Sequence, residues 1–272
     1  MLSTTSRWLT YLLGILYTIL GASLFVLPEQ LAPVFAWKVT AFMTMTIGAW
    51  CLGNAWLAFV VARRWRWSLV YPGLYYLWIF GIGELFVLIV FRANLFLVHP
   101  IAWLYLITLV VNVIAALVGL LELLRSRPAV DSGPKPTSLQ YGGLIAFIVL
   151  VGLLGLYGCT ARIGAVGTNG GIFPELMSLF TLRSFGVFYL SLALAVVPLL
   201  WDGNLNTWVS HGFAAFGLIL FITVAAFVYL RLFDFAANPG GLAYFGAYLA
   251  VGIPLLIIFL RSGTGLYSFS KN

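Results

Sequence analysis

Apolar residues follow one another in long, uninterrupted stretches along this chain. A helix needs about 20 mostly apolar residues to cross the hydrocarbon core of a bilayer, whereas the strands of a membrane barrel alternate apolar and polar residues. Stretches of the helical kind occur eight times, so the pattern predicts an all-α, polytopic membrane protein with eight transmembrane helices. They are predicted at residues 8–27, 39–61, 68–91, 100–124, 141–161, 181–201, 208–230 and 241–260.

The composition excludes several other classes of protein. Hydrophobic residues make up 63% of the 272 and charged residues only 8%, about a third of the roughly 25% found in soluble domains. A soluble globular enzyme, a disordered chain and a nucleic-acid-binding domain are therefore excluded. Two cysteines in different halves make neither a disulfide framework nor a metal site. We predict no metal and no cofactor, and the lipid bilayer as the main partner.

The distribution of positive charge predicts the orientation. Lys and Arg residues, counted on alternate sides of the predicted helices, number nine on one side and five on the other. The richer side is expected to be cytoplasmic, which places both termini inside the cell and the protein in a plasma or bacterial inner membrane. The nine residues are Arg7, Arg63, Arg64, Arg66, Arg125, Arg127, Lys135, Arg261 and Lys271.

Residues 126–140 differ in composition from the rest of the chain. They contain three prolines together with Asp131, Ser132, Gly133 and Lys135, which is typical of an exposed linker. We therefore predict a Pro-rich cytoplasmic linker at 126–140. It separates a first four-helix transmembrane unit at 1–125 from a second at 141–272.

The two predicted units resemble each other in sequence. Three residues of the first unit recur in the second at a constant offset of 139, in the pairs Arg92 and Arg231, Pro100 and Pro239, Tyr105 and Tyr244. An internal duplication is indicated. Because each unit has an even number of helices, both cross the membrane in the same sense, unlike the inverted repeats of many transporters. We predict two parallel four-helix repeats related by an axis along the membrane normal.

A family resemblance accompanies the repeat. Residues 182–194 spell Leu-Arg-Ser-Phe-Gly-Val-Phe-Tyr-Leu-Ser-Leu-Ala-Leu at the start of the second helix of the second unit. With this stretch the unit resembles the small DoxX-like four-helix membrane proteins. The first unit has Trp37, Lys38 and Val39 where Leu-Arg is expected, and continues the pattern at 48–52. The resemblance implies a compact antiparallel four-helix bundle, here in tandem, and lends no catalytic residues.

Glu84 is the one acidic residue deep inside a predicted span. It lies roughly 12 Å from the boundary at Arg92 by helical rise, where an ionised carboxylate costs about 2.5–3.5 kcal/mol on insertion scales. We expect it to face the protein interior. Two interpretations stay open: a proton relay, cation site or ligand contact, or one interhelical hydrogen bond, for instance to Asn112. Asn54 is a further buried candidate, for which a structural contact between helices is favoured.

Basic residues on the outer side are candidates for contacts with anions. Arg92 and Arg231 begin corresponding outer loops, and Arg183 opens the sixth span. Snorkelling to lipid phosphates is the ordinary role of such residues, and an anionic ligand or partner site is the alternative. The Pro-Glu pairs at 28–29 and 174–175 are typical of helix starts. They predict two short helices at the outer surface rather than a catalytic carboxylate pair.

Three functions stay open from the sequence. The first is non-catalytic: an accessory or scaffold subunit of a membrane complex, with partner subunits or further copies of the chain, or a binder of an apolar small molecule. The second is a small-solute or proton-coupled transporter that uses Glu84 with Asn112. The third is a lipid-modifying enzyme. An enzyme is disfavoured because the sequence contains no nucleotide-binding or serine-nucleophile motif.

Overall fold

The computed structural model describes residues 2–168, 175–237 and 239–261, and within these ranges every regular element is a helix. Eight helical segments are long and apolar enough to cross a membrane, as predicted. The long helices are α1 (Thr4–Val26), α3 (Ala41–Arg64), α4 (Trp67–Val90), α5 (Pro100–Ser126), α6 (Ser138–Thr160), α7 (Leu179–Val196), α9 (Leu205–Val228) and α10 (Gly240–Arg261). The short ones are α2 (Pro28–Leu31), η1 (Ala32–Val34), η2 (Arg92–Asn94), α8 (Leu199–Asp202) and η3 (Leu230–Leu232).

Local chemistry explains where several helices begin and end. The side chains of Thr40 and Ser178 each accept a hydrogen bond from the backbone N–H three residues later, at the starts of α3 and α7. Each hydroxyl satisfies one of the backbone donors that the first turn of a helix leaves unpaired. α7 ends at Val196 and α8 follows Pro198, which has no backbone N–H to continue the ladder. The predicted span at 181–201 is therefore interrupted near its end.

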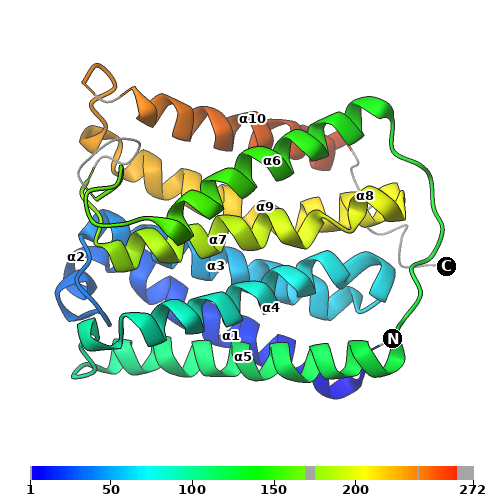
Figure 1. Ribbon diagram of the computed structural model, residues 1–272, viewed down its shortest axis with the longest axis horizontal. Helices are drawn as coiled ribbons and strands as arrows, with labels where there is room; N and C mark the ends of the chain where they lie inside the picture. Colours follow the sequence, from blue (N-terminus) through cyan, green and yellow to red (C-terminus); the bar gives the residue numbers. More distant parts are fainter. Residues whose placement is uncertain (1, 169–174, 238, 262–272) are drawn as a thin grey trace.

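The long helices lie side by side and alternate in direction along the chain (Figure 1). α3, α4, α7 and α9 lie in the middle, with α1 and α5 on one side of them and α6 and α10 on the other. α2, η2 and η3 lie at one end of the molecule, referred to below as the α2 end. The segment between α5 and α6 lies at the opposite end, the linker end, where α1 begins and α10 finishes.

Contacts between helices join the two halves of the chain. In the first half, α1 packs against α3 and α5, and α4 packs against the same two helices. In the second half, α6 packs against α7 and α10 against α9. Across the halves, α3 packs against α9, and α4 packs against both α7 and α9. Gly53 allows the first of these contacts, because a Cβ atom there would lie 2.6 Å from the Cα atom of Leu218.

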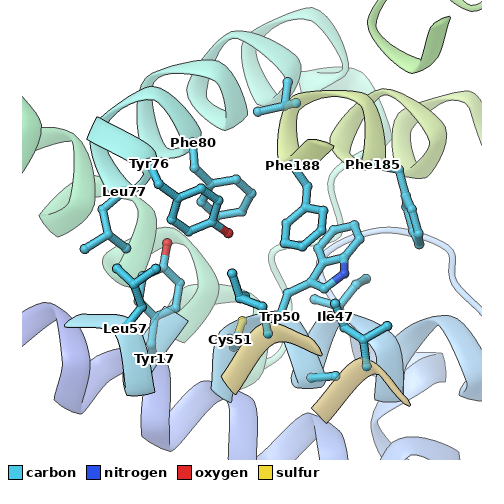
Figure 2. Packing of buried hydrophobic residues seen from close by; sticks show 14 of the residues in the cluster. Tyr17, Ile47, Trp50, Cys51, Leu57, Tyr76, Leu77, Phe80, Phe185 and Phe188 are labelled. Atoms are coloured by element: carbon cyan, nitrogen blue, oxygen red, sulfur yellow. The ribbon is translucent and has the colours of Figure 1, made fainter. Parts of the chain in front are cut away.

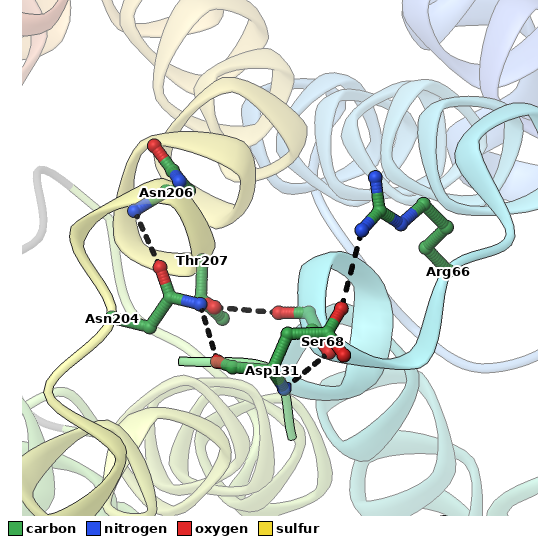
Figure 3. Close-up of polar contacts among 6 residues, drawn as sticks. All are labelled: Arg66, Ser68, Asp131, Asn204, Asn206 and Thr207. Carbon is green, nitrogen blue, oxygen red and sulfur yellow. Dashed lines mark hydrogen bonds and ion pairs between the residues drawn. The ribbon is translucent and has the colours of Figure 1, made fainter. Parts of the chain in front are cut away.

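The linker is tied to the helices, although the sequence predicted only an exposed segment. Arg66 and Asp131 form an ion pair at 3.2 Å, and the backbone N–H of Asp131 donates to Ser68 Oγ at 2.8 Å (Figure 3). Asn204 Nδ2 donates to the carbonyl oxygen of Asp131 at 2.8 Å, and Thr207 Oγ1 donates to that of Ser68 at 2.5 Å. The linker therefore fastens the start of α4 to the start of α9.

One of the two predicted short helices at the α2 end is present. Pro28 and Glu29 open α2, as predicted. Residues 175–178 are not helical, and Pro174 lies outside the described residues. Glu175 instead accepts a hydrogen bond from Thr40 Oγ1. The prediction that Glu175 lies in the first turn of a short helix is therefore wrong, and this carboxylate pairs with the N-terminus of α3.

Candidate functional site

Glu84 is buried in α4, about two turns before the helix ends at the α2 end. Its side chain is only 4% exposed, and its Oε2 atom accepts a hydrogen bond of 3.0 Å from Ser184 Oγ of α7. The one ion pair among the described residues joins Arg66 and Asp131, so no cation pairs with the Glu84 carboxyl group. Glu84 faces the interior as predicted, and its partner comes from the other half of the chain.

A small cavity lies beside Glu84. It holds about 30 Å³ and is lined by residues of α1, α3, α4, α5 and α7, among them the hydroxyl residues Thr108, Thr181 and Ser184. Two polar atoms of the lining residues, Glu84 Oε1 and Tyr105 Oη, make no hydrogen bond of standard geometry within the described residues, although the two side chains interact with each other. The lining is mostly apolar, and a cavity of this size has room for about one water molecule. It is far smaller than the roughly 300–1,000 Å³ of small-molecule pockets.

A second buried polar group lies closer to the linker end. Asn112 Nδ2 donates to Tyr17 Oη at 2.8 Å, and Tyr76 Oη donates to Asn54 Oδ1 at 2.7 Å. These four side chains come from α1, α3, α4 and α5, and none is more than 4% exposed. The hydrogen bond between Glu84 and Asn112 that the sequence suggested is absent from the described contacts, because each side chain bonds a different partner.

Buried aromatic side chains of α1, α3, α4 and α7, among them Tyr17, Trp50, Tyr76 and Phe188, gather in this part of the molecule (Figure 2). Trp50 of α3 stacks on Phe188 of α7 with 4.7 Å between ring centroids, and Trp37 stacks on Phe180 at 4.3 Å. Trp37 Nε1 also donates to Thr181 Oγ1 at 3.0 Å. Aromatic pairs of this kind stabilise contacts beyond the apolar area that they bury. They hold the first half of the chain against α7 and close the wall of the cavity.

The three arginines proposed as anion contacts make separate contacts. Arg183 Nη2 donates to the carbonyl oxygen of Ala161 at 3.1 Å, and its guanidinium lies 5.7 Å from the ring centroid of Phe91. Arg92 is exposed and donates to a carbonyl of the preceding helix at 3.3 Å. Arg231 is exposed as well. None of the described contacts joins these arginines into one anion site.

Two acidic side chains interact with the same tyrosine at the α2 end. Tyr229 Oη donates to Glu29 Oε1 at 3.0 Å, and Glu175 interacts with Tyr229 electrostatically. Burial and the carboxylate of Glu29 raise the pKa of Tyr229 to about 12, because both disfavour the phenolate. Within the described part of the chain, no group of three or more His, Cys, Asp or Glu could hold a metal ion.

Sequence reasoning did not identify the hydroxyl partners of Glu84. Ser184, its hydrogen-bond donor, lies 100 residues further along the chain, and nothing in the apolar pattern indicates which helices are neighbours. A signal was present nonetheless. Ser178, Thr181 and Ser184 recur every third residue, a spacing that places side chains on one face of a helix.

No protein-family model, curated protein or solved structure matches this sequence. The fold and the site therefore define the protein by class. It is a multi-pass helical membrane protein with a buried carboxyl group beside a water-sized cavity, which residues from both halves of the chain line.

Proposed function

We propose that this is a proton-coupled protein of the cell membrane in which Glu84 binds and releases a proton. The proposal assigns the site to the first of two parallel four-helix units, at 1–125 and 141–272, as the DoxX-like resemblance implies. It places both termini and the linker end in the cytoplasm and the α2 end outside. A small solute whose movement is coupled to the proton is the expected cargo, and no enzymatic step is included.

One observation carries the proposal: Glu84 Oε1 makes no hydrogen bond of standard geometry within the described residues, and the Glu84 carboxyl group and the Tyr105 hydroxyl interact beside a cavity that both side chains line. A carboxyl group that only held helices together would be most favourable with both oxygens bonded, because each unpaired polar atom in an apolar interior costs free energy. Here one oxygen is held by Ser184, and the other is buried beside the Tyr105 hydroxyl and a cavity with room for about one water molecule. This arrangement suits a group that exchanges a proton.

The other functions considered from the sequence have less support. A cavity of about 30 Å³ is too small for an apolar small molecule. A lipid-modifying enzyme would need polar groups that converge at one membrane interface, and the described contacts of Arg92, Arg183 and Arg231 are separate. A role beside partner subunits is compatible with proton coupling, because α6 and α10 bury little of their own surface in this chain.

The pattern of contacts supports the parallel duplication. The second long helix of each unit packs against the third long helix of the other, α3 against α9 and α7 against α4. A two-fold axis along the membrane normal would produce this reciprocal pair of contacts. Ser68 and Thr207, which are separated by 139 residues, hydrogen-bond each other at 2.5 Å. Equivalent positions that touch lie on the axis relating the two units, so this contact supports the offset derived from the sequence.

Infrared difference spectroscopy of the full-length protein in proteoliposomes tests the proposal. During a pH titration, wild type should show a carboxylic-acid C=O band whose intensity changes with pH. Glu84→Gln should lose this band, because the amide keeps the size of the side chain and cannot titrate. Glu122→Gln is the matched control, since Glu122 lies in α5 at the linker end and bonds Ser3. A titration that is identical in wild type and Glu84→Gln would overturn the proposal.

A further inference from the structure

We propose that Glu84 exchanges its proton with the α2 end of the molecule only, along a row of hydroxyl groups on α7. The row consists of Ser178, Thr181 and Ser184. This inference rests on the proposed function of Glu84 and adds the side of the membrane from which the proton comes. It follows from three observations: the hydrogen bonds of the row, its burial, and the residues on the opposite side of Glu84.

Two hydrogen bonds of the row, one at the surface and one at the carboxyl group, lie on either side of the cavity. Ser178 is exposed at the α2 end of α7, and its Oγ atom lies 2.9 Å from Thr181 Oγ1. Thr181 is 2% exposed and lines the cavity beside Glu84. Ser184, one turn further along the same face, is also 2% exposed and donates to Glu84 Oε2 at 3.0 Å. Two hydroxyls and one cavity therefore separate Glu84 from the exterior.

The row can pass a proton with one water molecule as the only added participant. A hydroxyl oxygen accepts one proton on a lone pair and releases its own proton to the next acceptor. Ser178 and Thr181 are close enough for this exchange in either direction. The cavity has room for one water molecule between Thr181 and Glu84 Oε1. A proton taken up at Ser178 thus leaves Thr181 for that water and ends on the Glu84 carboxylate, and release is the reverse.

The buried polar group of Tyr17, Asn112, Tyr76 and Asn54 lies on the linker side of Glu84, and beyond it apolar side chains close this direction. α4 runs from the linker end to the α2 end, so Leu74 and Leu77 lie on the linker side of Glu84. Both are 1% exposed, as is Leu13 of α1, and Leu57 of α3 is fully buried. Thr10, further toward the linker end, bonds a carbonyl of its own helix. Beyond that group, the described contacts of the first unit contain no row of hydroxyls that reaches the linker end.

The side chains around Glu84 support the assignment of the infrared band to its carboxyl group. Those that interact with it electrostatically are all tyrosine or cysteine side chains, and no Lys, Arg or His belongs to them within the described residues. Arg183 of α7 turns away to Ala161 and Phe91. The tyrosines and cysteines come from α1, α3, α4, α5 and α6: Tyr17, Cys51, Tyr76, Tyr105 and Cys159.

The experiment measures the sidedness and the rate of the Glu84 response. Full-length protein is reconstituted in proteoliposomes, sorted by the protease accessibility of an N-terminal tag, and given an external pH jump while the Glu84 infrared band is followed in time. Vesicles with the α2 end outward should respond at once. Vesicles with the linker end outward should respond only as the lumen equilibrates. A response from the linker end at least as fast as from the α2 end would overturn the inference.

Variants then test the row itself. Thr181→Val should slow the response by about tenfold, the kinetic equivalent of one lost hydrogen bond, and leave the end point of the titration unchanged. Thr181→Ser keeps the hydroxyl and should restore the wild-type rate, which separates a lost link from misfolding. Thr46→Val is the matched control, because Thr46 is equally buried and bonds only its own helix.

The two proposals fail in different ways. If the Glu84 band titrates but Thr181→Val responds as fast as Thr46→Val, the access route is wrong and the proton-binding function stands. If no band assigned to Glu84 titrates in wild type, the proposed function itself is wrong.

Discussion

Three buried polar side chains of the first half, Glu84, Asn54 and Asn112, have different environments. Each asparagine is bonded to a tyrosine on another helix, the arrangement by which neutral polar groups stabilise helix contacts in membranes by about 0.6 kcal/mol on average. Glu84 is bonded through one oxygen only and adjoins the cavity. Asn54 Nδ2 and Asn112 Oδ1 also lack a partner of standard geometry, so Glu84 differs from the asparagines in having an ionisable group that lines the cavity. The structural role of Asn54 stays a prediction.

Tyr229 gives a prediction for the dependence of stability on pH. Burial and the acceptor Glu29 raise its pKa from 10.0 to about 12. Between these values the unfolded chain has lost the phenolic proton and the folded chain keeps it, so the stability contributed below pH 10 is lost as pH rises toward 12. The melting temperature of Tyr229→Phe should therefore fall less than that of wild type between pH 10 and pH 12. Parallel declines would show that Tyr229 keeps an ordinary pKa in the folded protein.

At the scale of helices, the sequence predicted well which segments form long helices and how long each one is. A membrane span has one dominant requirement, about 20 apolar residues, and the chain meets it eight times. The break before Pro198 and the position of Glu175 were missed, because both depend on local backbone and on side chains of other elements. The partner of Glu84 was missed for the same reason. Hydrophobicity determines which segments cross the membrane, whereas small residues and the shapes of aromatic side chains determine which helices pack against each other.

The packing of α6 on α7 gives a prediction at this scale. A Cβ atom on Gly186 would lie 2.2 Å from the backbone nitrogen of Cys159 and 2.5 Å from the carbonyl carbon of Gly158. Gly186→Ala therefore forces the two backbones apart and should destabilise the protein by about 1–3 kcal/mol. Gly152→Ala is the control, because its Cβ atom would make an ordinary contact of 3.6 Å with Ala193.

Unfolding in bicelles, with hydrogen exchange of α6 as a second measurement, compares these two variants. Gly186→Ala should lose stability and protection along α6, and Gly152→Ala should behave as wild type. Equal stability of the two variants would mean that α6 is held by the surrounding lipid rather than by its contact with α7.

At the scale of the whole molecule, the candidate site depends on both halves of the chain. Glu84 and Tyr105 come from the first half, and Thr181 and Ser184 come from the second. The second half has no carboxyl group at the position that corresponds to Glu84, where the offset of 139 places Thr223. Under the proposed duplication, the halves have diverged into one that carries the carboxyl group and one that supplies its partner and its proposed access route.

This division predicts the behaviour of a split protein. The chain can be interrupted between residues 128 and 129, in the non-helical segment between α5 and α6. Co-expressed halves should purify together, because α3 packs on α9 and α4 on α7, and because Trp50 of α3 stacks on Phe188 of α7. Trp50→Ala should reduce the recovered complex, whereas Trp8→Ala should not, since Trp8 is 67% exposed. The reassembled protein should also keep the Glu84 infrared band. Halves that purify separately would mean that the covalent linker, with its contacts through Asp131, holds the two units together.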